Sequence, residues 1–216
     1  MGTATLLLLA DGRFPAGGHA HSGGLEAAVA RSRIRDLDSL REFLSGRLAT
    51  TGLVAAAFAA FACAHPGDLD SLELALDART PAKALRIAAR KQGRSLWRAA
   101  RVAWPSAVPG PAGDISQPIA LGVVAAAAGL NPLDAATVMA YTTVTGPAGA
   151  AVRLLGLDPY EVNAAVAALG PACDETAARA VTYVDGPIDA LPANAAPLLD
   201  ISAEDHATWE VRLFAS

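Results

Sequence analysis

Two histidines near the N-terminus come closest, by type and spacing, to a chemical site. His19 and His21 form a His-x-His pair, and Asp11 is close to them in the sequence. Imidazoles bind nickel, zinc and copper, so these three residues could serve a small metal-dependent hydrolase. A stable site needs three or four ligands, and neither His65 nor His206 has a supporting spacing. We therefore predict no metal-ligating residues, with the hydrolase as the alternative.

The remaining sequence matches no catalytic pattern. Ser22 fails the GxSxG spacing of a nucleophile elbow, because Ala20 stands where the first glycine is needed. There is no GxxxxGK[ST] loop, which excludes a P-loop nucleotidase, and no GxGxxG fingerprint of a dinucleotide fold. We predict a protein that binds other proteins, is not an enzyme, has no catalytic residues and carries no cofactor.

A row of basic residues is the most informative charged feature. It comprises six cations at spacings of three and four, which lie on one face of a helix. Like charges at this spacing repel slightly, so helix stability does not explain the row. It could be neutralised within the chain, for example by acidic residues between positions 68 and 77, or it could meet an acidic protein partner. The row consists of Lys83, Arg86, Arg90, Arg94, Arg98 and Arg101.

Helices must position these residues, because the composition favours an all-α fold. Of the 216 residues 53% are hydrophobic and only 5% aromatic, and alanine supplies much of the apolar content. Alanine favours helices, whereas strands favour β-branched and aromatic residues. We predict a single compact helical domain at 1–183 and a C-terminal extension at 184–216. Roughly eight helices are expected, at about 3–10, 22–32, 37–64, 69–77, 81–104, 117–129, 132–156 and 159–183.

Repeated start signals define several of these helices. Asn131, Asp158 and Thr80 each stand before a proline, which places a capping side chain ahead of proline at the first helical position. Asp36 precedes another long apolar pattern. Two segments rich in glycine and proline, 11–24 and 105–116, interrupt the pattern and predict a turn and a loop.

Charge and hydropathy restrict where the protein can act and which classes of partner it can bind. The longest apolar runs, Leu53–Ala64 and Ile119–Leu130, are 12 residues each, and a membrane span needs about 20. The net charge of −4 argues against nucleic-acid binding. Cys63 and Cys173 lie outside any metal or redox pattern, which is typical of buried thiols in a reduced compartment. We expect a cytoplasmic protein that binds neither a membrane nor nucleic acid.

Several stretches, in order along nearly the whole chain, resemble one known family. The segment LADGRFPAGGHAHSGGLEAAV resembles the signature of the urease accessory protein F (UreF) family, most closely its actinobacterial branch. Gln92, Gly93 and Arg94 resemble its Gln-x-Gly-Arg helix, without the spacer residue. AAVRLLGLDPYE, with Arg153, and the ending RLFAS resemble two later motifs. The signature residues are Pro15, Gly17, Gly18, Ser22, Gly24 and Glu26.

The resemblance implies an all-α homodimer that bridges the urease accessory D/H protein and the nickel-carrying GTPase during nickel insertion into apo-urease. Nickel would be the cargo of the complex. Arg94 or Arg153 could modulate GTP hydrolysis as an arginine finger; regulation of an unrelated GTPase is an alternative. The resemblance also implies partner contacts by the turn at 13–26 and the tail at 209–216, although either segment could instead pack on its own helices. The expected partner-binding residues are Pro15, Gly17, Gly18, His19, Ser22, Gly24, Glu26, Arg94, Arg153, Arg212, Leu213 and Phe214.

Overall fold

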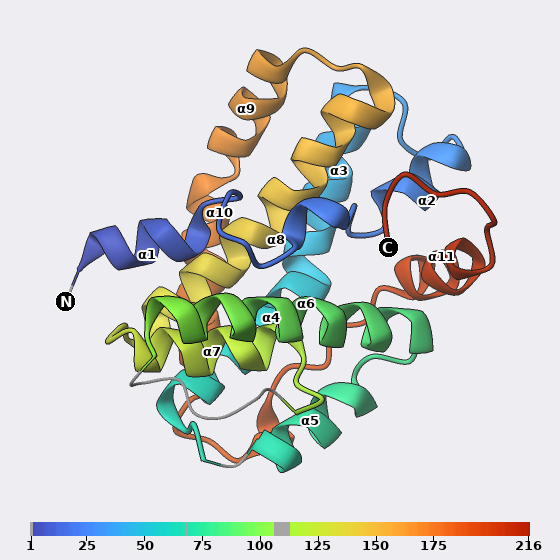
Figure 1. Cartoon of the computed structure of the whole chain (residues 1–216). Helices are drawn as coiled ribbons and strands as arrows, with labels where there is room; N and C mark the ends of the chain where they lie inside the picture. The colour runs from blue at the N-terminus through green and yellow to red at the C-terminus, as the bar shows by residue number, and fades with distance from the viewer. Residues whose placement is uncertain (1, 68, 106–112) are drawn as a thin grey trace.

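The structure, a computed structural model, describes residues 2–67, 69–105 and 113–216. These residues form α-helices and no strand, so the predicted all-α class is confirmed (Figure 1). The α-helices number eleven within the described ranges, against roughly eight expected. They are α1 Thr3–Ala10, α2 Leu25–Ala30, α3 Leu37–Arg47, α4 Leu53–Ala64, α5 Leu69–Ala78, α6 Lys83–Ala103, α7 Gln117–Ala127, α8 Pro132–Leu155, α9 Pro159–Ala168, α10 Gly170–Val181 and α11 Pro197–Ala207.

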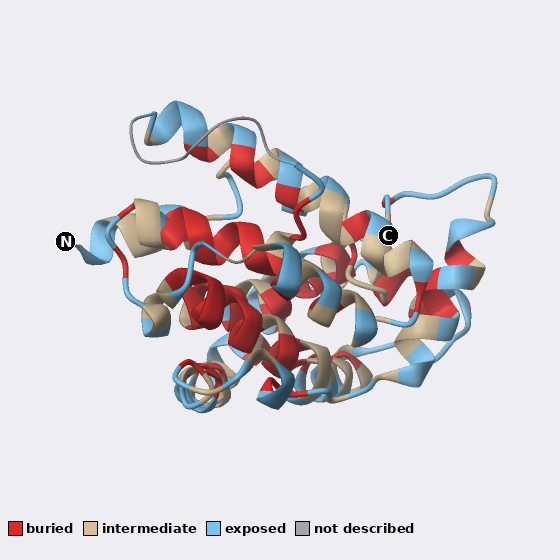
Figure 2. Ribbon diagram, turned by 90° about the horizontal axis from the view of Figure 1, so that it is seen from below, coloured by how far each residue is buried: buried red, intermediate tan, exposed pale blue. Residues whose placement is uncertain are grey.

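Helix α4 is the centre of the bundle. It packs against α7, α8 and α10, and nearly all of its residues are buried. Its many alanines allow this close approach, as does Gly122 of α7, where a side chain would overlap the carbonyl oxygen of Ala59. Figure 2 shows the buried residues gathered in the middle of the molecule, with exposed residues on the outer turns.

Helix α8 joins the central core to a second apolar cluster. Its first half packs beside α4, and its second half contributes Val144 and Ala148 to the second cluster. That cluster also takes Leu25 from α2 and Leu40 from α3. Phe214, two residues from the end of the chain, lies in the same cluster. The end of the chain is therefore packed against the interior.

The sequence predicted one helix at 37–64, but this segment is not a single regular helix. A π-helical turn at Leu48–Gly52 separates α3 from α4. Among the described residues this segment is the one helical stretch long and apolar enough to cross a membrane, but 67% of its most apolar window is buried inside the protein. Such burial is what a core helix of a globular bundle shows.

Local capping signals predicted three helix starts correctly. The side chains of Asp36 and Asn131 each accept a hydrogen bond from the backbone three residues on, in reciprocal capping boxes. Asp158 accepts a hydrogen bond from the backbone N–H of Tyr160 at 2.8 Å. In each case the capping group is next to the helix it caps, which is why sequence alone reveals it.

The predicted cap at Thr80 is wrong. Helix α6 begins at Lys83, and the hydroxyl of Thr80 donates to the carbonyl of Leu76 in α5 instead. The first turn of α6 receives its acceptor from the far end of the chain: Glu204 Oε1 lies 2.8 Å from the backbone nitrogen of Ala84. A carboxylate at a helix N-terminus also faces the positive end of the helix dipole.

The predicted boundaries differ from the structure in two further places. The expected helix 159–183 breaks at Leu169, because Gly170 and Pro171 begin a new helix, α10. The C-terminal region, without an expected helix, contains α11, which packs against α6 and α2. Arg31 of α2 pairs with Asp205 of α11 at 2.7 Å. Residues 106–112 of the predicted loop lie outside the described residues.

Candidate partner-binding surface

Two segments from opposite ends of the sequence form one surface. The first is the glycine turn, residues 13–26, and the second is the C-terminal tail, residues 209–216. The backbone N–H of Ala215 donates to the carbonyl of Ala20 at 2.7 Å, and the N–H of Ser22 donates to the backbone oxygen of Ser216 at 2.7 Å. We call the combined feature the turn–tail surface. Figure 1 places the end of the chain beside α2 and the glycine turn.

Ser22 and His21 hold the tail with their side chains. The Ser22 hydroxyl donates to the backbone oxygen of Ser216 at 2.8 Å and accepts from the N–H of Glu26 at 3.2 Å. The ring Nδ1 of His21 lies 2.7 Å from Ser216 Oγ. Burial, with the nearby charges of Lys91 and His19, lowers the pKa of His21 to about 4. His21 is therefore neutral at physiological pH. The hydrogen bonds of Ser22 give this residue a structural role.

Glu26 is the polar centre of the turn–tail surface. It lies in the first turn of α2 and is only 8% exposed. Its carboxylate accepts hydrogen bonds from the backbone N–H groups of Leu213 at 2.8 Å and Phe214 at 3.0 Å, and lies 2.9 Å from His206 Nε2. Burial alone would raise the pKa of Glu26, but these three hydrogen bonds outweigh it and lower that pKa below its ordinary value. Trp209 packs its ring on His206, with centroids 4.8 Å apart.

Arg153 of α8 joins the turn to the tail from the other side. Its guanidinium carbon lies 4.4 Å from the ring centroid of Phe214, as in a cation–π contact. Its Nη2 donates to the carbonyl of His19 at 3.1 Å. Phe214 is 4% exposed, so its ring packs within this chain. Among the predicted residues, His19, Ser22, Glu26, Arg153 and Phe214 therefore form one cluster.

The backbone conformation of the turn requires glycine at some of its glycine positions and not at others. Gly17 and Gly24 have φ of 78° and 90°, a left-handed conformation that favours glycine. A side chain at Gly24 would also contact Leu199 of α11 at 3.0 Å. Gly18 has no such φ and open space around it, and both Gly18 and Pro15 are exposed. Gly17 and Gly24 thus shape the turn, while Pro15 and Gly18 lie on its surface.

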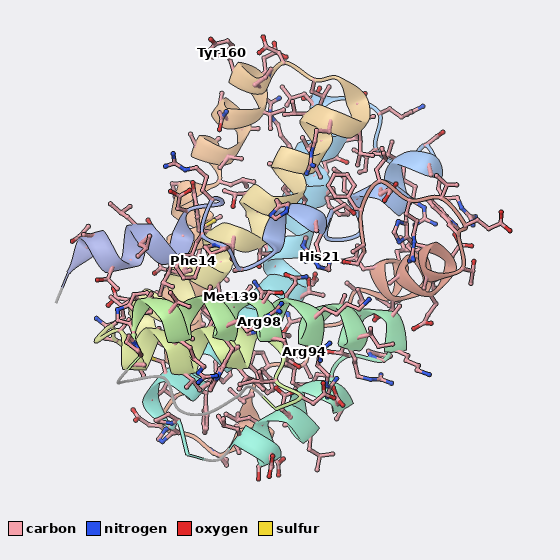
Figure 3. The ribbon with its side chains drawn as sticks, viewed as in Figure 1. Phe14, His21, Arg94, Arg98, Met139 and Tyr160 are labelled. Atoms are coloured by element: carbon pink, nitrogen blue, oxygen red, sulfur yellow. The ribbon has the colours of Figure 1, made fainter. Side chains whose placement is uncertain are left out.

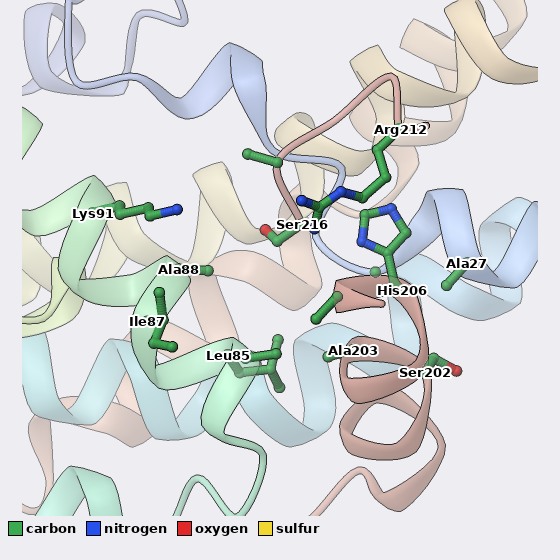
Figure 4. A pocket seen from close by; sticks show the side chains of 14 residues that line it. Ala27, Leu85, Ile87, Ala88, Lys91, Ser202, Ala203, His206, Arg212 and Ser216 are labelled. Carbon is green, nitrogen blue, oxygen red and sulfur yellow. The ribbon is translucent and has the colours of Figure 1, made fainter. Parts of the chain in front are cut away.

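The outer side of the tail is apolar and basic. The side chains of Val211 and Leu213 are 86% and 75% exposed, and Arg212 is exposed between them. A cavity of about 190 Å³ lies beside the tail, between α6 and α11. Figure 4 shows Lys91 of α6 and Arg212 of the tail at this cavity, with Ser216 between them in the view.

The basic row on α6 is partly neutralised within the chain. Arg90 pairs with Asp77 at 2.8 Å, Glu73 at 3.5 Å and Asp114 at 3.2 Å. Arg94 pairs with the same Asp114 at 2.9 Å, and no hydrogen bond or ion pair joins it to a described residue of the turn–tail surface. The intramolecular interpretation therefore holds for the middle of the row. Figure 3 labels Arg94 and Arg98 on α6.

The remaining cations of the row divide into two kinds. Arg86 donates to the carbonyls of Thr80 and Pro81 at 2.7 and 2.8 Å. Lys83, Arg98 and Arg101 are exposed and form no ion pair with any residue that the structure describes. The ends of the row are thus free to meet an acidic partner, whereas its centre is not.

The residues of the metal-hydrolase alternative line one cavity but are not grouped as metal ligands. Asp11 pairs with Arg13 at 2.8 Å, and His21 faces Ser216. Within the described ranges no three His, Cys, Asp or Glu side chains are grouped so that they could hold a metal ion. Cys63 and Cys173 are buried and unpaired, as predicted, and burial raises the pKa of Cys63 to about 11.

Three contributors to the site were not predicted. His206 and Glu204 lie on a helix that had no strong start signal, and their partners are 180 and 120 residues away. Arg47, which donates to the carbonyl of Gly23 at 2.8 Å, ends α3 beneath the glycine turn. No motif in the sequence around Arg47 singles it out.

These features define an all-helical protein in which a glycine-rich turn and a C-terminal tail are joined into one surface. The sequence model of the UreF family matches residues 34–170. Proteins described as urease accessory protein UreF are similar over nearly the whole chain. That of Mycobacterium sp. (strain JLS) is 46% identical over 98% of both chains, and that of Mycolicibacterium vanbaalenii is 44% identical over 99% of this chain and 98% of its own.

The Mycobacterium tuberculosis (strain ATCC 25618 / H37Rv) protein of the same description is 41% identical over 99% of this chain and 98% of its own. The chain belongs to the UreF family of urease accessory proteins. The resemblance seen in the sequence is thereby confirmed.

Proposed function

We propose that this protein is a non-enzymatic co-chaperone of urease maturation. It bridges the urease accessory D/H protein and the nickel-carrying GTPase, so that apo-urease receives nickel through the complex. Nickel is the cargo of that complex, and this chain has no resident cofactor. The protein acts in the cytoplasm as a homodimer. Family membership supports the pathway, and the turn–tail surface supports the mode of action.

The observation that carries this proposal is that the tail has a fixed backbone and exposed side chains. Its backbone is fixed by Glu26 and Ser22, whereas Val211, Arg212 and Leu213 face outward. Apolar side chains with an arginine, on a backbone already ordered, lose little conformational entropy when a partner binds. The tail therefore serves best as a preformed contact for the accessory D/H protein.

The basic side chains next to the tail suggest the chemistry of a partner. Arg212 and Lys91 line the same cavity, and Lys83 lies on α6 without an ion pair among the described residues. Such a surface attracts acidic segments and speeds their association. An acidic region of either accessory protein would fit here.

Helix α1 supports self-association. Leu7 and Leu8 are 61% and 45% exposed, while Leu9 is buried against the core. One side of the helix predicted at 3–10 therefore packs on the core, and the other side is exposed. Adjacent exposed leucines on a helix are typical of a surface that another subunit covers. We assign the homodimer contact to this helix.

Our proposal includes no arginine finger. Arg153 is engaged with Phe214 and His19, and Arg94 with Asp114. A finger must reach the transferring phosphoryl group with a free guanidinium. The GTPase would dock on this protein without receiving a catalytic arginine from it.

Urease activity in a strain that lacks this protein tests the proposal. We expect activity to be lost at limiting nickel and restored by the wild-type gene. Leu213→Asp should fail to restore it, because a charge replaces an apolar contact. Val102→Asp is the matched control, since Val102 of α6 is 84% exposed and distant in sequence from both segments. Full activity in the deletion strain at limiting nickel would refute the role in urease maturation.

A further inference from the structure

A guanidinium inside the fold lacks a counter-ion. Arg47 Nη1 donates to the carbonyl of Gly23, but its Nε is closed off from solvent and has no hydrogen-bond partner among the described residues. Arg90 Nε also makes no hydrogen bond, but it lies 3.2 Å from Asp114 Oδ2, and two further carboxylates are within ion-pair distance of this guanidinium. Arg47 forms no ion pair with any carboxylate that the structure describes. Arg47 is half-buried, and an unpaired charge that is largely closed off from water is unfavourable, so this site favours an anion.

The backbone is distorted where Arg47 enters the interior. The π-helical turn at Leu48–Gly52 follows it directly, and such turns are rare and frequent at functional sites. Gly52 is closely packed: a side chain there would lie 3.1 Å from both the Arg47 carbonyl and the Thr143 methyl group. Gly23 is closely packed as well: a Cβ atom there would lie 3.2 Å from the guanidinium carbon of Arg47. The guanidinium therefore lies directly against the backbone of Gly23, to which it donates a hydrogen bond.

Two cavities meet at Arg47. Their volumes are about 170 and 380 Å³. Together they extend from the segment before α11 to the interior side of the glycine turn. Met139, labelled in Figure 3, lies on the wall of both. The residues shared by the two cavities are Gly23, Arg47, Gln92, Gln117, Met139 and Thr143.

Two glutamine side chains lie beside Arg47 and can donate N–H groups to a bound ligand. Gln92 of α6 and Gln117 of α7 line both cavities, and their side-chain amides make no hydrogen bond to any described residue. Two acidic side chains on the cavity walls are paired with other arginines. Asp11 pairs with Arg13, and Asp77 pairs with Arg90. Asp200 and the terminal carboxylate of Ser216 also line the smaller cavity, but neither forms an ion pair with Arg47, so the described chain leaves this guanidinium without a counter-ion.

We propose that Arg47, Gln92 and Gln117 form a binding site for a small oxyanion of the carboxylate or phosphate class. A planar guanidinium and two amides offer several N–H donors, which is the arrangement that oxyanions favour. The oxyanion is either a free ion or the carboxylate of an acidic side chain that a partner inserts. Binding of a free ion follows from this chain alone, whereas insertion of a partner's carboxylate rests on the proposed function.

Thermal unfolding of the purified full chain tests the site. Sodium phosphate and sodium formate are compared with sodium chloride at matched ionic strength. An anion that binds only the folded chain raises the unfolding midpoint by roughly 2–4 °C at about five times its Kd. We expect this rise in the wild type and its loss in Arg47→Gln. Arg41→Gln is the matched control, because Arg41 is exposed on the same helix and should keep the rise.

Two further variants keep the test decisive if Arg47→Gln does not fold. Arg47→Lys retains the charge without the planar fork, and Gln117→Leu removes one amide; both should reduce the rise. If neither anion stabilises the wild type, co-purification with the accessory proteins is compared for the Arg47 and Arg41 variants. A loss of tenfold or more, confined to Arg47, assigns the oxyanion to a partner's carboxylate. Equal rises in all variants, or no effect in either assay, would overturn the site.

Discussion

The carboxylate of Glu26 accepts a hydrogen bond from the backbone N–H of Leu213 at 2.8 Å, although 187 residues separate the two. This bond fixes the tail's backbone while the side chain of Leu213 remains 75% exposed. A binding surface made in this way is ordered before its partner arrives. Glu26 fixes the middle of the tail, and Ser22 holds its last residue.

Replacing Glu26 with glutamine should loosen the tail. The amide would lose the negative charge, and its NH₂ group would face N–H donors. Hydrogen bonds to a charged group contribute about 1.5–3 kcal/mol each, so we expect a loss of roughly 1–3 kcal/mol in the free energy of unfolding. Hydrogen exchange at Leu213 and Phe214 should speed up. Glu42→Gln, at an exposed position of α3, is the control and should change neither quantity.

Acid should weaken the turn–tail surface in two steps. The pKa of His21 is lowered to about 4, so the unfolded chain takes up a proton first as the pH falls from about 6.5. Stability from this neutral histidine is thus present above pH 6.5 and decreases toward pH 4. The pKa of Glu26 is also lowered, so its contribution is present above the ordinary glutamate value and is lost as the pH falls through its folded value.

Denaturant unfolding measured from pH 7.5 to pH 3.5 checks both steps. His21→Asn should flatten the upper part of the pH profile, and Glu26→Gln the lower part. Profiles that match the wild type in both variants would show that neither group is linked to folding.

Two glycines should tolerate no side chain. A methyl group at Gly93 of α6 would overlap the carbonyl of Ile115, and one at Gly122 of α7 would overlap that of Ala59. Overpacking of this kind typically costs about 1–3 kcal/mol, so Gly93→Ala and Gly122→Ala should lower the urea midpoint. Gly149 of α8 has open space around it. Gly149→Ala should therefore stabilise the helix by roughly 0.5–1 kcal/mol, and a loss comparable to the other two would contradict the packing described.

Removing the candidate finger arginines should leave GTP hydrolysis intact. Because Arg94 and Arg153 are bound within this chain, Arg94→Ala and Arg153→Ala should not slow turnover by the accessory GTPase in the assembled complex. Arg153→Ala should instead speed hydrogen exchange in the tail. A decrease of a thousandfold or more in turnover, the typical contribution of a finger, would restore that role.

Sequence reasoning succeeded where the cause is local. The caps at Asp36, Asn131 and Asp158 act within three residues, and composition alone indicates an all-α fold. It failed at α6, because the carboxylate that meets the first turn of that helix comes from Glu204, 120 residues away. The break before α10 had a readable signal in Gly170-Pro171.

The candidate site was predictable in its parts and not in its assembly. The family motifs named Ser22, Glu26, Arg153 and Phe214 individually. No sequence spacing shows that these residues meet, since their contacts join segments more than 130 residues apart. The π-helical turn and the unpaired Arg47 likewise emerge only when the helices are packed.

The most direct test of the turn–tail surface is a pull-down of the purified accessory D/H protein by this chain carrying Leu213→Asp, beside Val102→Asp as control. Both substitutions place a charge at an exposed apolar position, so neither should unfold the protein. We predict at least a tenfold loss of binding for Leu213→Asp and wild-type binding for Val102→Asp. Unchanged binding by a folded Leu213→Asp protein would contradict the assignment of this surface to a partner.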